Sequence, residues 1–300
     1  MSSQERIGEA PQPGVQAHQA ELRKELGIVV VLAQITCIVT LEFFGTAVKA
    51  GSSHAALWLT AIALFFVPQA LGVTYLNQLM PLEGGLYEWA RLIFNDATGF
   101  LVAWNLWLYI VFLVAEYGFV LITYFAFALG PDAAWMASSK WLIVGASAAL
   151  VGGLAWVSVL GLRIGKWITN AGGVVTIVAL GVLILLPLFR PMPGTDPAYH
   201  RLPLVRPALT LLSLSVFTKM TFGALCGFEF VAIFAGESRT PARTLARSIL
   251  FAAPMIALLY IFGTGAILAF VPSREVNLIG PIPQALSISS YVCDPAGRQS

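Results

Sequence analysis

The chain reads FGALCGFEFVAIFAGESRTPARTLARSI from Phe222 to Ile249, and this stretch decides the fold. The apolar segment around its start carries Gly223, Gly227 and Glu229 at its middle. Each glycine weakens a helix by about 1 kcal/mol relative to alanine, and a carboxylate is unfavourable in hydrocarbon unless it faces protein or water. One interpretation is therefore a helix that unwinds halfway across a membrane, where transporters bind substrate. The alternative is that the glycines only let helices pack closely, and the spacing alone favours neither.

The composition is that of an integral membrane protein. Hydrophobic residues make up 58% of the chain and charged residues 11%, with a mean hydropathy of +0.82. A soluble domain is about half apolar and a quarter charged. The net charge of +2 gives no reason to expect a nucleic-acid partner. No HExxH, GxSxG or Walker-type sequence occurs, and the 3 cysteines form no disulfide framework. We therefore expect no enzyme activity, no metal and no cofactor.

The apolar residues gather into segments that are long enough to cross a bilayer, which takes roughly 20 residues. There are seven of them, at 28–48, 55–80, 98–129, 137–160, 168–189, 210–236 and 246–271. These segments predict an all-α membrane protein with seven transmembrane helices.

The ends of the chain are more polar than the transmembrane core that we expect over residues 28–271. Residues 1–27 predict a cytoplasmic tail with a short interfacial helix, and residues 272–300 predict an outer loop and a tail. The loops that would lie inside hold slightly more Lys and Arg than those outside, which favours a cytoplasmic N-terminus. The expected location is the plasma membrane, or the inner membrane if the source is bacterial.

Two motifs resemble those of the amino acid–polyamine–organocation (APC) transporters. The first is the sixth-segment signature of that superfamily, a Gly-aromatic-Glu core followed by a second Glu, Thr-Pro and basic residues. The matching residues are Gly227, Phe228, Glu229, Glu237, Thr240, Pro241, Arg243 and Arg247. The second motif joins FFVPQAL, which contains Pro68, to PLEGGLYEWAR at residues 81–91. It looks closest to the glutamate/GABA-antiporter and polyamine-uptake branches, and the whole resemblance runs from Val29 to Ala285.

The resemblance implies two inverted repeats of five helices, in which the first and sixth helices are symmetry-related and broken in the middle. Seven segments complete the first repeat and only begin the second, so we expect a chain that is truncated at its C-terminus. The implied function is secondary active transport of amino acids or related amines, as a permease or antiporter, with the substrate and the lipid bilayer as partners. The alternative is a non-transporting amino-acid sensor or an ion channel on the same scaffold, although no repeated pore-lining element is present.

The resemblance also indicates where substrate would bind. In the family the first helix breaks at a Gly-x-Gly-like turn that holds the substrate carboxylate, and counting back from Ala50-Gly51 puts this turn near residues 36–38. Its glycines are absent here. The expected substrate-binding residues are Thr36, Cys37, Ile38, Thr40, Gly223, Ala224, Cys226, Gly227 and Glu229. Proton-coupled members carry a lysine in the fifth helix, but the region near Val175 is apolar, so that route of coupling is not expected and the coupling ion stays open.

Three charged residues, Glu42, Glu116 and Lys219, fall inside apolar segments and are expected to be buried. Lys219 lies about 14 Å along its helix at 1.5 Å per residue. Facing lipid there is unfavourable by at least ~2.5 kcal/mol, so we expect an ion pair, with Glu42 as the first partner and Glu116 as the second. The alternative is a solvated lysine near the outer interface.

The two cysteines Cys37 and Cys226 fall at the expected breaks of the first and sixth helices. We therefore expect both to border one central cavity. The alternative is that they are small apolar fillers in separate helix contacts.

Overall fold

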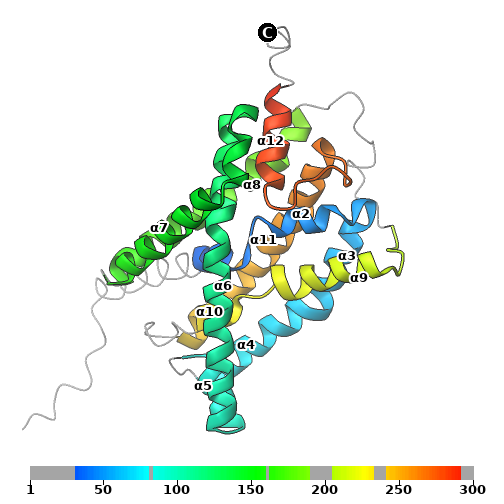
Figure 1. Cartoon of the computed structure of the whole chain (residues 1–300). Coiled ribbons are helices and arrows are strands. Elements are labelled where there is room, and N and C mark those ends of the chain that lie inside the picture. The colour runs from blue at the N-terminus through cyan, green and yellow to red at the C-terminus, as the bar shows by residue number, and fades with distance from the viewer. Residues whose placement is uncertain (1–30, 81–83, 160–161, 190–204, 233–240, 292–300) are drawn as a thin grey trace, which may run out of the picture.

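The computed structural model describes residues 31–80, 84–159, 162–189, 205–232 and 241–291. Within these ranges the regular structure is entirely helical. Six helices are long and apolar enough to span a membrane, which makes the protein a multi-pass membrane protein (Figure 1). Their bounds are Gly51–Leu79, Asp96–Leu129, Lys140–Val157, Asn170–Pro187, Leu211–Phe230 and Ala246–Phe270.

The first expected segment is not among these six helices, because it is divided into two short pieces. Residues 31–38 are helical, residues 39–40 are unwound, and a turn leads into α2 (Phe43–Val48). Three consecutive β-branched residues, Ile38, Val39 and Thr40, stand at the break, and such residues lower helix propensity. The break therefore lies just beyond residues 36–38, where we expected it, and those residues are helical.

The second segment crosses the bundle as a continuous run of helical turns of different kinds. It contains η1 (Gly51–Ser53), α3 (His54–Ala61), the π-helical turn η2 (Ile62–Phe66) and α4 (Val67–Leu79). Pro68 stands in the first turn of α4 and lacks the N–H that an uninterrupted α-helix would need there. The π-turn immediately before this proline shifts the hydrogen-bond register at that point.

The sixth segment is interrupted, as predicted. It consists of α9 (Leu211–Thr218), the π-helical turn η5 (Lys219–Ala224), an unwound piece at residues 225–227, and α10 (Phe228–Ala232). Gly227 lies in the unwound piece with φ of 138°, a conformation that side-chain-bearing residues rarely adopt.

The other glycine of this segment fulfils the alternative role. Gly223 lies within η5, where a Cβ atom would come 2.5 Å from Cε1 of Phe43 on α2. The two interpretations of the glycine pair therefore both hold, one for each residue: Gly227 permits the break and Gly223 permits close packing.

Seven helices remain in the described ranges. They are α5 (Leu86–Ile93), α6 (Asp96–Leu129), η3 (Pro131–Ser138), α7 (Lys140–Val159), α8 (Leu162–Phe189), α11 (Pro241–Phe270) and α12 (Pro281–Tyr291). Four of them agree with predicted segments except at their ends, whereas α5, η3 and α12 were not predicted as segments. α8 begins six residues before the predicted segment. α12 lies inside residues 272–300, which we expected to form a loop and a tail, and its prolines hid it because they occupy the first turn, where proline is tolerated. The expected tail at residues 1–27 and the loop residues Glu237 and Thr240 lie outside the described residues.

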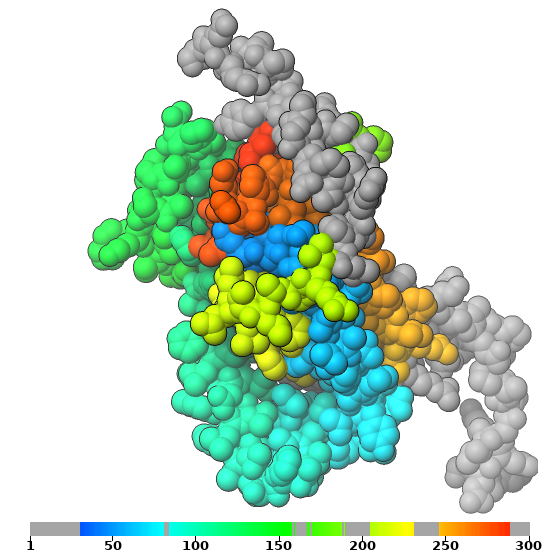
Figure 2. All heavy atoms as spheres, turned by 90° about the vertical axis from the view of Figure 1, so that its right-hand side faces the viewer, coloured from blue at the N-terminus to red at the C-terminus, as the bar shows by residue number. Residues whose placement is uncertain are grey.

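The core lies where the broken helices meet α11. α11 contacts α2, α3, α4, α8 and α12, and in Figure 1 it runs behind α2 through the middle of the bundle. In Figure 2 the yellow α9 lies directly against the blue α2. The largest fully buried side chains of this region are Trp58, Tyr260, Phe44, Phe66 and Phe228. The aromatic core therefore surrounds the two breaks.

Candidate functional site

The two helix breaks lie directly against each other. A Cβ atom on Gly227 would stand 2.7 Å from Cγ1 of Ile38 and 3.4 Å from the carbonyl oxygen of Cys37. The unwound piece of the sixth segment therefore rests on the last turn of the helix at residues 31–38. Only glycine allows so close an approach in this backbone conformation.

One side chain from α11 connects both breaks. The Tyr260 hydroxyl lies 2.7 Å from the carbonyl oxygen of Ile38 and 3.0 Å from that of Ala224, and it accepts a hydrogen bond of 3.1 Å from the N–H of Thr40. Each break ends a helix and so leaves backbone groups without helical partners. A hydroxyl has one proton to share between the two carbonyls and a lone pair for the amide. Tyr260 therefore satisfies unwound backbone from both segments.

Tyr260 is itself held firmly. Its side chain is fully buried and stacks on Trp58, with 4.5 Å between the ring centroids. The ring centroid of Phe44 lies 5.0 Å from that of Tyr260. Trp58 Nε1 donates to Thr264 Oγ1 at 3.0 Å, and this hydroxyl donates to the Tyr260 carbonyl at 2.7 Å. Our sequence analysis missed Tyr260. The available signal was a tyrosine hydroxyl inside an apolar segment, because a buried hydroxyl requires a partner.

Glu229 fixes the start of α10. Its Oε2 atom accepts hydrogen bonds from the N–H of Gly227 at 3.1 Å and from Gln69 Nε2 at 2.9 Å. Beside it, Phe228 stacks on Phe66 at 4.8 Å. These contacts tie α10 to the second segment. The other carboxylate oxygen of Glu229, Oε1, accepts no hydrogen bond from the described residues.

The first break also exposes unused backbone donors. Among the described residues, no acceptor is found for the N–H groups of Leu41 and Glu42, which follow the unwound residues 39–40. Unpaired N–H groups inside a membrane bundle are unfavourable unless water or a ligand satisfies them. The break therefore presents donors next to the carboxylate-bearing sixth segment.

The predicted site residues divide into two groups. Thr36 is turned toward α8, because its hydroxyl donates to the Leu32 carbonyl at 2.9 Å and lies 3.0 Å from a Cβ atom built on Gly173. Ile38 and Ala224 have fully buried side chains and offer their carbonyls to Tyr260. These three residues support the breaks and do not present side chains to a ligand.

Four of the other predicted residues remain accessible at the breaks, whereas Gly227 is buried. The Cys37 side chain is exposed, and Thr40, Cys226 and Glu229 are half-buried. Both thiols are free and lie within electrostatic range of the Glu229 carboxylate. This agrees with a shared location for the two cysteines, whereas a common cavity stays a prediction.

The three charged residues that we expected to be buried differ in their surface exposure. Glu42 is half-buried, but Glu116 and Lys219 are exposed. In the described part of the chain, Arg91 forms ion pairs with Glu88 and Asp96. Within these residues Lys219, which opens the π-turn η5, therefore forms no ion pair with Glu42.

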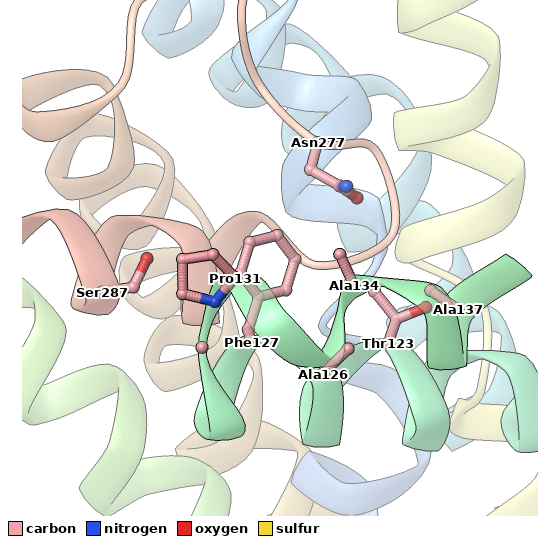
Figure 3. A pocket seen from close by; sticks show the side chains of 9 residues that line it. Thr123, Ala126, Phe127, Pro131, Ala134, Ala137, Asn277 and Ser287 are labelled. Carbon is pink, nitrogen blue, oxygen red and sulfur yellow. The ribbon is translucent and has the colours of Figure 1, made fainter.

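A cavity of about 360 Å³ lies away from the breaks, near the C-terminal end of α6 (Figure 3). It is lined by Thr123, Ala126, Phe127, Gly130, Pro131, Ala134, Ala137, Asn277 and Ser287. Its polar groups are largely engaged, because the Thr123 hydroxyl donates to the Phe119 carbonyl and Asn277 Oδ1 accepts from two backbone N–H groups. Within the described ranges, no cluster of three or more His, Cys, Asp or Glu could hold a metal ion.

Comparison with known proteins identifies the family. The sequence profile described as amino acid permease matches residues 28–291. The chain belongs to the amino acid permease family. This confirms the resemblance to APC transporters, and the family is one of transporters and not of enzymes.

The chain is similar to several curated proteins. It is 24% identical to an uncharacterized transporter of Legionella pneumophila over 261 residues, which is 86% of this chain and 55% of the relative. It is also 24% identical to a probable agmatine/putrescine antiporter of Lactococcus lactis, over 82% of this chain and 52% of that protein. A lysine-specific permease of Escherichia coli is 22% identical over 80% of this chain and 48% of its own length. The chain thus spans about half the length of these curated relatives.

Proposed function

We propose that this protein is a secondary active transporter for amino acids or related amines, working as a permease or an antiporter. The observation that carries this proposal is the meeting of two interrupted helices, joined by the Tyr260 hydroxyl. Interrupted helices at the middle of a bundle supply backbone donors and acceptors where lipid offers none, and transporters use them to bind substrate.

The site has partners for both ends of an amino acid. The free N–H groups of Leu41 and Glu42 suit a carboxylate, whereas the Glu229 carboxylate suits an ammonium group. Cys37, Thr40 and Cys226 line the same place. The names of two relatives, an agmatine/putrescine antiporter and a lysine-specific permease, support an amine or amino acid as substrate.

The proposal includes the finer features that the family resemblance implies. These are seven transmembrane helices, symmetry between the first and sixth helices within a five-plus-five inverted repeat, a cytoplasmic N-terminus and a plasma-membrane location. It also includes transport without a cofactor and without nucleic acid as a partner, while the coupling ion stays open.

Reconstitution into liposomes tests the proposal. Labelled lysine, leucine and putrescine are offered to liposomes that are empty or preloaded with unlabelled substrate, with and without an ion gradient. Uptake or exchange above protein-free liposomes is the expected result. Binding without accumulation would instead indicate a sensor, substrate-independent current would indicate a channel, and the absence of binding and uptake would refute the proposal.

A further inference from the structure

Glu42 has an unusual place next to the first break. It lies two residues beyond Thr40, at the N-terminal end of α2, and is half-buried. A carboxylate within a spanning segment has to face protein or water, and functional sites are its most common setting. No contact described above, in the core or at the Tyr260 hydroxyl, uses the Glu42 side chain.

Glu42 and Glu229 each stand at the N-terminal end of a half-helix that begins at a break. Glu42 precedes α2, and Glu229 lies in the first turn of α10. Glu229 is held by Gly227 and Gln69 on the α10 side. A molecule bound between the breaks would therefore lie next to the N-terminal ends of both half-helices, which carry these carboxylates.

The face of α6 toward Glu42 is polar and also negative. Tyr109, Tyr117 and Tyr124 recur every seven or eight residues, which places them on one side of the helix, with Glu116 beside them. All four side chains are close enough to Glu42 for an electrostatic interaction with its carboxylate. The Tyr124 hydroxyl oxygen is buried and has no hydrogen-bond partner among the described residues.

Aromatic stacking keeps this face of α6 opposite the sixth segment. The ring of Tyr109 stacks on that of Phe230, next to Glu229, at 5.9 Å and 8°. The Tyr109 hydroxyl therefore lies beside the sixth segment, where it can donate to or accept from a bound molecule.

The described residues provide no cation to balance this group. Among these residues, Arg91 on α5 forms ion pairs with Glu88 and Asp96. Lys219 is exposed and forms no ion pair with Glu42. Carboxylates at membrane depth attract a positive charge, because the low dielectric strengthens Coulomb interactions. A substrate with a single ammonium group would balance the charge at Glu229 only.

We propose that Glu42 is a specificity-determining residue that binds the second positive charge of a basic amino acid or diamine. Glu116 strengthens the attraction, and the hydroxyls of α6 hydrogen-bond to the bound ammonium or guanidinium group. This inference rests on the proposed transport function and names its substrate class. The class consists of diamines, which carry two separated cationic groups, and of amino acids that carry a cationic group in addition to the α-amine.

Lysine and norleucine form a matched pair for the test, since they differ by the terminal ammonium group. Binding of each to the purified full chain in lipid nanodiscs is measured by isothermal titration calorimetry. The unaltered protein should bind lysine more tightly than norleucine. Glu42→Gln should weaken lysine binding by at least about tenfold, which corresponds to about 1.4 kcal/mol, and leave norleucine unchanged. Glu275→Gln makes the same charge change at an exposed loop position and should leave both affinities as they are.

The possible results separate the two proposals. Equal binding of lysine and norleucine by the unaltered protein, or an unchanged preference in Glu42→Gln, overturns the role of Glu42 while transport still stands. Binding of neither ligand also overturns the role of Glu42, and the transport proposal is then decided by the liposome assay with leucine and putrescine. If Glu42→Gln does not fold, Glu116→Gln decides, because its exposed side chain is not needed for packing. That variant should reduce the preference for lysine by a smaller factor, and an unchanged preference there also overturns the inference.

Discussion

Replacing Tyr260 with phenylalanine removes one oxygen atom and keeps the ring that stacks on Trp58. The backbone groups that lose the hydroxyl are not equally affected. Thr40 N–H and the Ile38 carbonyl also bond to each other at 3.0 Å, so both retain a partner. Among the described residues, the Ala224 carbonyl has no other donor. A buried polar group without a partner destabilises a protein by about 1–3 kcal/mol. We expect Tyr260→Phe to lower the free energy of unfolding by that amount.

Tyr75→Phe is the matched control. It removes the same atom from a tyrosine on α4 that is 62% exposed, so its effect should stay within about 0.5 kcal/mol. Unfolding of both variants is followed in detergent by tryptophan fluorescence during denaturant titration. Substrate affinity is measured alongside, because freeing the breaks should weaken binding in Tyr260→Phe alone. Equal stability and equal affinity of the two variants would show that the hydroxyl does not connect the breaks, and the reasoning would be refuted.

Other changes test single parts of the site. Gly227→Ala places a Cβ atom 2.7 Å from a neighbouring side chain at φ of 138°, so we expect destabilisation by about 1–3 kcal/mol and loss of binding in thermal-shift and ligand titrations. Gly72→Ala on α4 has free space around it and should stabilise by up to about 1 kcal/mol; an equal effect of both glycine changes would contradict the special geometry of the break. Substrate should slow maleimide labelling of both Cys37 and Cys226, and protection of one thiol alone would argue against a shared cavity. Lys219→Met should change the free energy of unfolding by less than about 0.5 kcal/mol. A loss above about 2 kcal/mol would indicate that Lys219 forms a buried ion pair, which the structure lacks among its described residues.

The sequence predicted the features that depend on local composition. The break in the sixth segment was predicted from two glycines, which weaken a helix wherever it lies, and from a glutamate inside an apolar run, which is unfavourable in hydrocarbon. The first break was placed two to three residues early, since its position was counted from a Gly-x-Gly turn that this chain does not have. The β-branched run from Ile38 to Thr40 marks the actual position.

The features that sequence reasoning missed depend on contacts between distant segments. The hydroxyl of Tyr260 meets Ile38, which lies 222 positions away in the chain, and no local pattern encodes that contact. Lys219 is exposed and opens a π-turn, which rotates the side chains after it away from the faces that a regular helix predicts. Helical periodicity extended through such a turn therefore misplaces side chains.

A structure of the protein with bound lysine, determined by electron cryomicroscopy in nanodiscs, tests the role of the two breaks most directly. The ligand should lie between residues 39–42 and 225–227, with its carboxylate at the N–H groups of Leu41 and Glu42 and its ammonium groups near Glu229 and Glu42. Lysine bound elsewhere, for example in the cavity beside Asn277 at the end of α6, with the breaks empty, would contradict the account.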